Sequence, residues 1–121
     1  MPWITVVKGQ SFTIATNDGY PLIEKIEANE NFAPLKKKLT GLGLQLFSTV
    51  NYDDGEMVIS LGVEFHRDRH IFQGLTLSLN DATTDVQMQN VNLIADELKQ
   101  LLTNMGLEFE NKQGLIVSQF D

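Results

Sequence analysis

The chain has 121 residues, of which 42% are hydrophobic and 21% are charged, and its formal net charge is −7. This length fits a single domain that spans residues 1–121 around one core, and the apolar fraction excludes a disordered chain. The negative charge disfavours nucleic acid as a partner, and no apolar run approaches the ~20 residues that a membrane-spanning helix needs.

The sequence contains no cysteine, and its opening stretch MPWITVVKGQ lacks the basic and long apolar segments of a signal peptide. Small exported domains often depend on disulfides, so we expect this protein in the reducing cytoplasm. Acidic residues are concentrated in residues 80–121, where seven carboxylates and two lysines give a net charge of −5. This acidic segment either keeps the protein in solution or faces a partner protein with a basic surface.

The first expected element is a β-hairpin. Residues 3–7 and 11–16 are rich in strand-forming side chains and are separated by Lys8-Gly9-Gln10. A three-residue turn there pairs Val6 with Phe12 and puts the alternating apolar side chains on one face, as a half-buried hairpin requires.

Two short helices are expected next. Leu22, Ile23 and Ile26 have helical spacing, although a short strand is the alternative for residues 20–30. Residues 34–40 carry apolar side chains at i and i+4, and Gly41 is the expected end of that helix.

The centre of the chain predicts a hairpin around Asp54-Gly55, because Gly accepts a positive φ and Asp tolerates it. A two-residue loop pairs Tyr52 with Met57 and makes the apolar face nearly continuous. A three-residue loop would instead place polar Asn51 opposite Met57, so the pattern favours the two-residue loop.

A second reversal, centred on Asp68, is expected to return the chain along residues 71–79. In this register Leu61 pairs with Leu75 and Gly62 lies beside Gly74. Ser60, Phe72 and Thr76 surround the two glycines on the outer face of the sheet. A surface without side chains lets another element approach the backbone closely, so we expect either a binding surface or a contact within this chain.

Both histidines of the chain lie in the same reversal. His66 and His70 face each other there, and a metal would bind between them. Structural zinc sites use four protein ligands and catalytic sites use three, and Arg67 and Arg69 add positive charge nearby. The pattern therefore favours an exposed polar hairpin tip over a metal site.

The strongest helical pattern follows. Apolar residues recur at intervals of three and four between Val91 and Met105, Thr84 and Gln87 resemble a capping box, and Gly106 is the expected stop. One or two strands are expected after this helix.

The sequence offers little for catalysis. It has no thiol, its Gly41-Leu42-Gly43 stretch lacks the third glycine of a nucleotide-binding loop, and its paired carboxylates lie in polar surroundings. The lysines at positions 36–38 fit the C-terminal end of a helix. We therefore predict no catalytic residue, no cofactor and no enzyme activity.

Together these patterns predict an α+β fold. An antiparallel β-meander carries a long C-terminal amphipathic helix and a shorter N-terminal helix on one face. The predicted function is a small acidic protein-binding module, such as an inhibitor, an immunity-like protein or a chaperone-like adaptor, in a monomer or homodimer. The alternative is a small-ligand or metal-binding domain that uses the Gly62/Gly74 surface or the His66/His70 tip.

Overall fold

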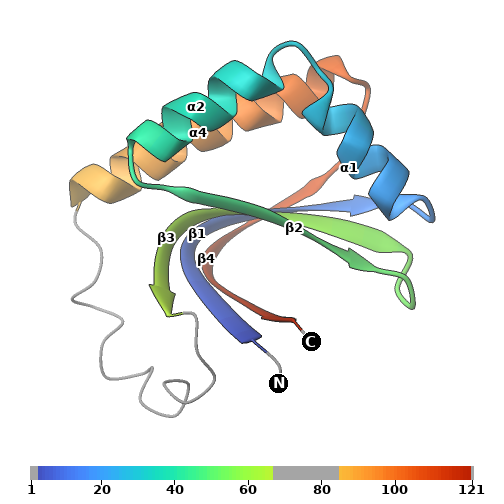
Figure 1. Cartoon of the computed structure of the whole chain (residues 1–121), viewed down its shortest axis with the longest axis horizontal. Helices are drawn as coiled ribbons and strands as arrows, with labels where there is room; N and C mark the ends of the chain where they lie inside the picture. Colours follow the sequence, from blue (N-terminus) through green and yellow to red (C-terminus); the bar gives the residue numbers. More distant parts are fainter. Residues whose placement is uncertain (1–2, 67–84, 121) are drawn as a thin grey trace.

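The computed structural model describes residues 3–66 and 85–120, and these form an α+β fold, as the sequence predicts (Figure 1). The described strands make one antiparallel sheet in the order β2-β3-β1-β4, and the helices lie on one of its faces. In chain order the elements are β1 (Trp3–Ala15), α1 (Gly19–Glu27), α2 (Phe32–Gly41), β2 (Gln45–Asn51), β3 (Glu56–His66), α4 (Asp85–Asn104) and β4 (Glu110–Phe120).

The predicted N-terminal hairpin is wrong, because β1 is one continuous strand of 13 residues. Gly9 does not turn the chain. It pairs with Gly62 of β3 on one side and with Gly114 of β4 on the other. The apolar alternation of this segment fits a straight strand as well as a hairpin with this turn, since side chains two residues apart on a strand point the same way. The alternation alone did not distinguish a turn from a straight strand.

The central hairpin has the predicted faces but a different register. Val50 pairs with Met57 and Leu46 pairs with Leu61, so the loop contains four residues, 52–55. The predicted two-residue loop is therefore wrong, although Gly55 has the expected positive φ of 63°. A shift of two residues leaves every side chain on its original face, and the hydrophobic pattern is the same for both registers.

The predicted pairing of Leu61 with Leu75 is also wrong. Leu61 pairs with Gln10 of β1 on one side and with Leu46 of β2 on the other. A strand has two hydrogen-bonding edges, and both are occupied at this position. Residues 67–84 lie outside the described part of the chain, so the remainder of that predicted hairpin, including its tip, stays a prediction.

The first two helices decide between helix and strand for residues 20–30, and the second helix extends beyond its predicted range. Helix α1 covers most of residues 20–30, so this segment is helical and not a strand. Helix α2 begins at Phe32 and includes Gly41, which was the predicted stop. The left-handed conformation occurs two residues later, at Gly43 with φ 74°, and the Leu44 amide then donates to the Leu39 carbonyl at 3.0 Å. That bond satisfies a carbonyl at the helix end.

Helix α4 covers the sheet as predicted, and Gly106 follows its end with φ 77°. The described part of α4 starts at Asp85, and Thr84 lies outside the described residues, so the capping box stays a prediction. No helix in residues 3–66 and 85–120 is long and apolar enough to cross a membrane.

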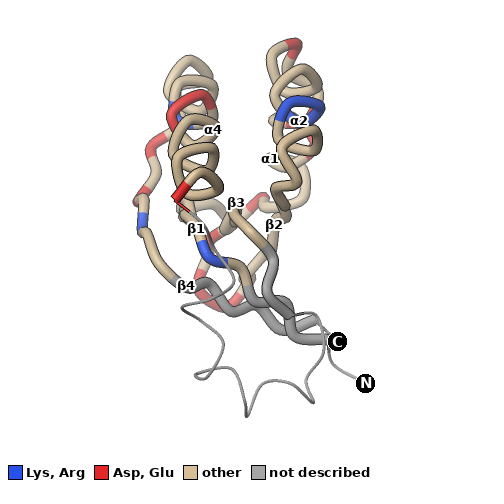
Figure 2. The backbone as a smooth tube through the Cα atoms, turned by 90° about the vertical axis from the view of Figure 1, so that its left-hand side faces the viewer, with Lys and Arg blue, Asp and Glu red and all other residues tan. Residues whose placement is uncertain are grey.

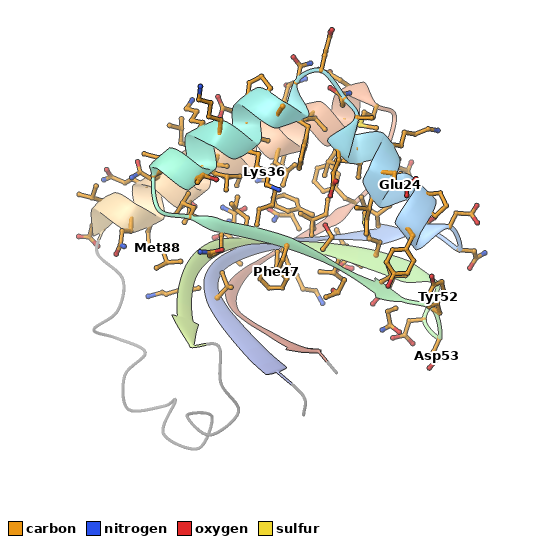
Figure 3. The ribbon with its side chains drawn as sticks, in the orientation of Figure 1. Glu24, Lys36, Phe47, Tyr52, Asp53 and Met88 are labelled. Carbon is orange, nitrogen blue, oxygen red and sulfur yellow. The ribbon has the colours of Figure 1, made fainter. Side chains whose placement is uncertain are left out.

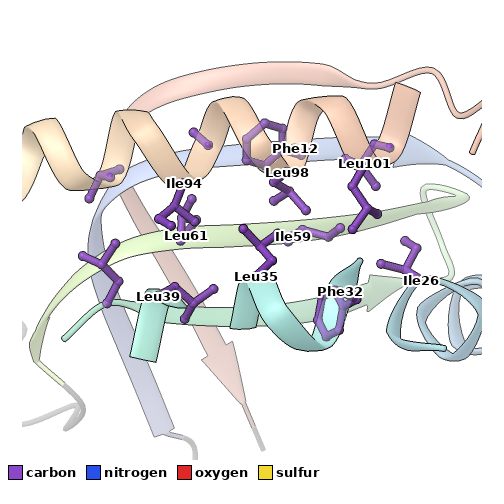
Figure 4. Packing of buried hydrophobic residues seen from close by; sticks show 14 of the residues in the cluster. Phe12, Ile26, Phe32, Leu35, Leu39, Ile59, Leu61, Ile94, Leu98 and Leu101 are labelled. Atoms are coloured by element: carbon purple, nitrogen blue, oxygen red, sulfur yellow. The ribbon is translucent and has the colours of Figure 1, made fainter. Parts of the chain in front are cut away.

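The core lies between the helices and the sheet (Figure 4). As predicted, the apolar stripe of α4 meets the odd-numbered side chains of β3. Burial of each large aliphatic side chain contributes roughly 1.5–3 kcal/mol before the loss of chain entropy is subtracted. The α4 members are Val91, Ile94, Ala95, Leu98, Leu101 and Leu102; the others include Phe12, Ile14, Met57, Ile59, Leu61, Ile26, Phe32, Leu35 and Leu39.

A short series of hydrogen-bonded side-chain amides crosses this interface. Asn111 of β4 donates through Nδ2 to Oε1 of Gln10 at 3.2 Å, and Gln10 donates through Nε2 to Oδ1 of Asn92 on α4 at 2.8 Å. Gln10 is buried, so these contacts satisfy an amide that would otherwise be costly under the helix. These two hydrogen bonds fix the position of α4 relative to β1 and β4, the two strands beneath it.

Candidate binding groove

Strand β2 is at an edge of the sheet, with β3 as its hydrogen-bonded neighbour among the described strands. Each of its seven residues is exposed or partly exposed. Its sequence, QLFSTVN, contains no charge, no proline and no glycine. Edge strands of this kind are where another strand can add to a sheet through backbone hydrogen bonds.

The opposite edge of the sheet is different. Strand β4 carries the charged residues Glu110 and Lys112, and Gly114 has a φ of 128° that departs from strand geometry. Charges and irregular backbone at an edge are the usual means by which proteins prevent strand addition. The less protected edge is therefore β2.

A groove of about 270 Å³ runs above β2, between this strand and the first two helices. Figure 3 shows Lys36 of α2 above the middle of β2, with Tyr52 and Asp53 at the far end of the same strand. Most of the lining residues are apolar, as in hydrophobic grooves that receive a segment of another protein. The lining residues are Tyr20, Ile23, Ile26, Glu27, Phe32, Lys36, Leu46, Phe47, Ser48 and Ile59.

Two tyrosines mark the hairpin end of this groove. The rings of Tyr20 and Tyr52 have centroids 5.9 Å apart, and the residues are 58% and 65% exposed. The backbone holds them together, because the Thr16 amide donates to the Gly55 carbonyl at 2.8 Å and joins the loop before α1 to the β2–β3 loop. Tyrosine combines an apolar ring with a polar hydroxyl group and is enriched in protein interfaces.

The same end of the groove is acidic. Asp18 precedes the helix that carries Tyr20, and Asp53 and Asp54 follow Tyr52. The Asp54 carboxylate accepts a hydrogen bond from Asn51 at 2.6 Å. Within the described residues, no lysine or arginine forms an ion pair with any of these three carboxylates. A cation from outside the chain would meet an uncompensated negative field there.

The lysine cluster at positions 36–38 divides between two surfaces. Lys36 lines the groove above β2, whereas Lys38 forms an ion pair of 2.9 Å with Glu97 of α4. Figure 2 shows α2 and α4 standing side by side on the sheet, with lysines on α2 and acidic residues on α4. Both members of this ion pair line a second hollow of about 320 Å³ between these helices.

The sheet surface predicted around Gly62 is not open on the β1 side. A Cβ added to Gly62 would overlap the Lys8 carbonyl oxygen. Ser60 is fully buried, and its hydroxyl has no hydrogen-bond partner among the described atoms. The other residues predicted for this surface, Gly74, Phe72 and Thr76, lie outside the described part of the chain. The surface as a ligand site therefore stays a prediction.

The alternative of a metal site at His66 and His70 also lies partly outside the described residues. His66 is the last residue of β3 and pairs with Val6, while His70 lies outside the described residues. In residues 3–66 and 85–120, no group of three or more histidine, aspartate or glutamate side chains could hold a metal ion. The facing arrangement of the two histidines stays a prediction.

Sequence reasoning missed the groove. The uncharged stretch QLFSTVN was visible, but its position at an edge depends on pairing between β1 and β3, which are far apart in the sequence. Tyr20 gave no signal either, because its approach to Tyr52 depends on contact between two loops.

No protein-family model matches this chain, and no curated protein matches its sequence. The solved structure of a de novo designed protein, Foldit4, aligns with 98% of this chain and 97% of its own, at 9% sequence identity and a TM-score of 0.39. A likeness this weak carries no argument about the fold or the function.

Proposed function

We propose that this chain is a non-enzymatic protein-binding module that accepts an extended segment of a basic partner protein along the edge of β2 that no described strand occupies. The observation that carries the proposal is the uncharged edge strand QLFSTVN beneath an apolar groove. In strand addition, main-chain hydrogen bonds supply affinity, and pockets for alternate side chains supply specificity.

Charge favours a basic partner over a second copy of the chain. The net charge of −7 makes two copies repel each other, and the hairpin end of the groove is acidic as well. A basic protein would be attracted over a distance and then held at the edge. The proposed compartment is the cytoplasm, which the absence of cysteine supports.

The polar groups of the groove support binding more than catalysis. Glu27 and Lys36 are both exposed, and the described lining residues include no histidine. Acid–base catalysis usually places its two groups in unlike environments, whereas both of these side chains are solvated.

The proposal is tested with random nine-residue peptides displayed on phage and selected on the immobilised chain. The enriched peptides are then synthesised, and hydrogen exchange of the chain is measured with and without each peptide. The expected result is slower exchange in β2, because its outward backbone amides become hydrogen-bonded. Ser48→Lys, which places a charge in the groove, is expected to abolish binding.

The matched control is Gln113→Lys, which adds the same charge to the exposed surface of the other edge strand, β4, and is expected to bind normally. Enriched peptides that protect other segments and leave β2 unprotected would refute the proposal. Protection of β2 that rises with the concentration of the chain alone would also refute it, because that result shows pairing between two copies.

A further inference from the structure

We infer that the partner segment carries an arginine whose guanidinium stacks on the Tyr20–Tyr52 pair and pairs with Asp53. The inference rests on the proposed strand addition at β2 and specifies which side chain the hairpin end of the groove selects. The group that this end of the groove recognises is a planar cation, which is a narrower requirement than any positive charge.

The geometry of the tyrosines determines where such a cation would lie. Centroids 5.9 Å apart with an interplanar angle of 51° describe rings that already contact each other, so nothing fits between them. Both residues are more than half exposed, at 58% and 65%, so their outer faces are open. A guanidinium stacks on such a face through its π system and through attraction to the ring quadrupole.

The carboxylates explain why the stacked group is charged. Asp53 directly follows Tyr52 in an exposed loop, and no ion pair with a described residue engages it. Arginine presents a rigid fork of donors that fits a carboxylate while its plane remains stacked. A lysine ammonium would satisfy the charge but has no planar group to stack, so arginine is favoured.

The charge at the middle of the groove sets the position of the arginine along the segment. Lys36 lines the groove together with Ser48, and Tyr52 is four residues further along the chain. In extended chain this separation is roughly 13 Å. Lys36 repels a cation bound beside Ser48, so the arginine belongs at the Tyr52 end of the bound segment.

The test uses the peptides enriched by selection on the chain. In each peptide every arginine is replaced in turn by glutamine and by lysine, and affinities are measured for the wild-type chain and for Asp53→Asn and Tyr52→Leu. One arginine is expected to matter, with a loss of about two- to tenfold on replacement by glutamine and a smaller loss with lysine. That loss is expected to shrink in both variants, because each removes a partner of the guanidinium.

One variant serves as the control. Asp96→Asn removes a carboxylate from the exposed face of α4, outside the groove, and is expected to keep the full arginine effect. Equal losses in the wild-type chain and in Asp53→Asn, with β2 still protected from exchange, would overturn the arginine inference and leave the proposed function standing. Enriched peptides without arginine would overturn it too, whereas failure to protect β2 would refute the proposed function itself.

Discussion

Gly9 of β1 and Gly62 of β3 are directly paired, and the backbones of the two strands leave no room for a side chain at either position. A Cβ on Gly9 would overlap the carbonyl oxygen of Leu61 and lie 2.7 Å from the Cα of Gly62. A Cβ on Gly62 would overlap the carbonyl oxygen of Lys8. Gly114 of β4 continues the row on the other side of Gly9, and β1, β3 and β4 curve together in Figure 1. Glycine allows strands to bend and to approach in this way.

Replacing either glycine of this pair by alanine is expected to destabilise the protein. In Gly9→Ala and in Gly62→Ala the added methyl meets backbone atoms, which have no alternative rotamer, so the strands must separate. We expect a loss of about 3 kcal/mol in the free energy of unfolding, at the upper end of the usual cost of overpacking. Urea denaturation monitored by circular dichroism measures it.

Gly41→Ala is the matched control. A Cβ at Gly41 meets no atom within 4 Å, and the residue is the last of α2. Alanine is the better helix former, so the variant is expected to be as stable as the wild type or slightly more stable. A wild-type midpoint for Gly9→Ala would show that β1 and β3 do not approach as described.

Helix α4 is expected to depend on Leu98, which is 1% exposed in the core. Leu98→Ala removes buried methyl groups and leaves a cavity, at an expected cost of about 2–5 kcal/mol. Leu93→Ala on the same helix is the control, because Leu93 is 51% exposed and an ordinary surface change alters stability by about 0.5 kcal/mol or less. Equal effects of the two substitutions in urea denaturation would contradict the assigned face of the helix.

The buried amide of Gln10 predicts an asymmetry between two substitutions. Asn92→Ala removes the acceptor of the Gln10 Nε2 group and leaves a buried donor without its partner, at a cost of about 1–3 kcal/mol. Gln10→Met removes the buried amide itself, after which exposed Asn92 can bind water and Asn111 keeps its hydrogen bond to the Ser11 carbonyl at 3.1 Å. The Met variant is therefore expected to lose less stability, and thermal melts that reverse the order would show that Gln10 is not isolated from water.

The sequence predicted which side chains face the core better than it predicted which strands are neighbours. The alternation in β2 and β3 assigned Val50, Met57 and Ile59 to the helix-covered face, and the helical spacing assigned Leu98. These patterns have a period of two or 3.6 residues and are local. Register is not local, and a shift of two residues leaves the whole pattern unchanged.

The candidate groove was less predictable for the same reason. Gly62 was expected beside Gly74, yet its partner is Gly9, more than fifty residues earlier in the chain. The pairing of β1 with β3 places β2 at the edge and so exposes it. A local turn signal at Gly9 was misleading, because the glycine is required by the close approach of another strand and not by a reversal.

The register of the central hairpin is testable with engineered disulfides, because the chain has no cysteine of its own. Thr49 and Val58 are direct partners across β2 and β3, whereas a two-residue loop would place Thr49 opposite Ser60. Side chains directly opposite have Cβ atoms about 4.5–5.5 Å apart, close to the range that a disulfide spans, and diagonal neighbours are about 7–8 Å apart. Thr49→Cys combined with Val58→Cys is therefore expected to oxidise rapidly, and Thr49→Cys combined with Ser60→Cys slowly. Thiol titration after mild oxidation measures both rates. Faster oxidation of the second pair would show that the hairpin has the register of a two-residue loop.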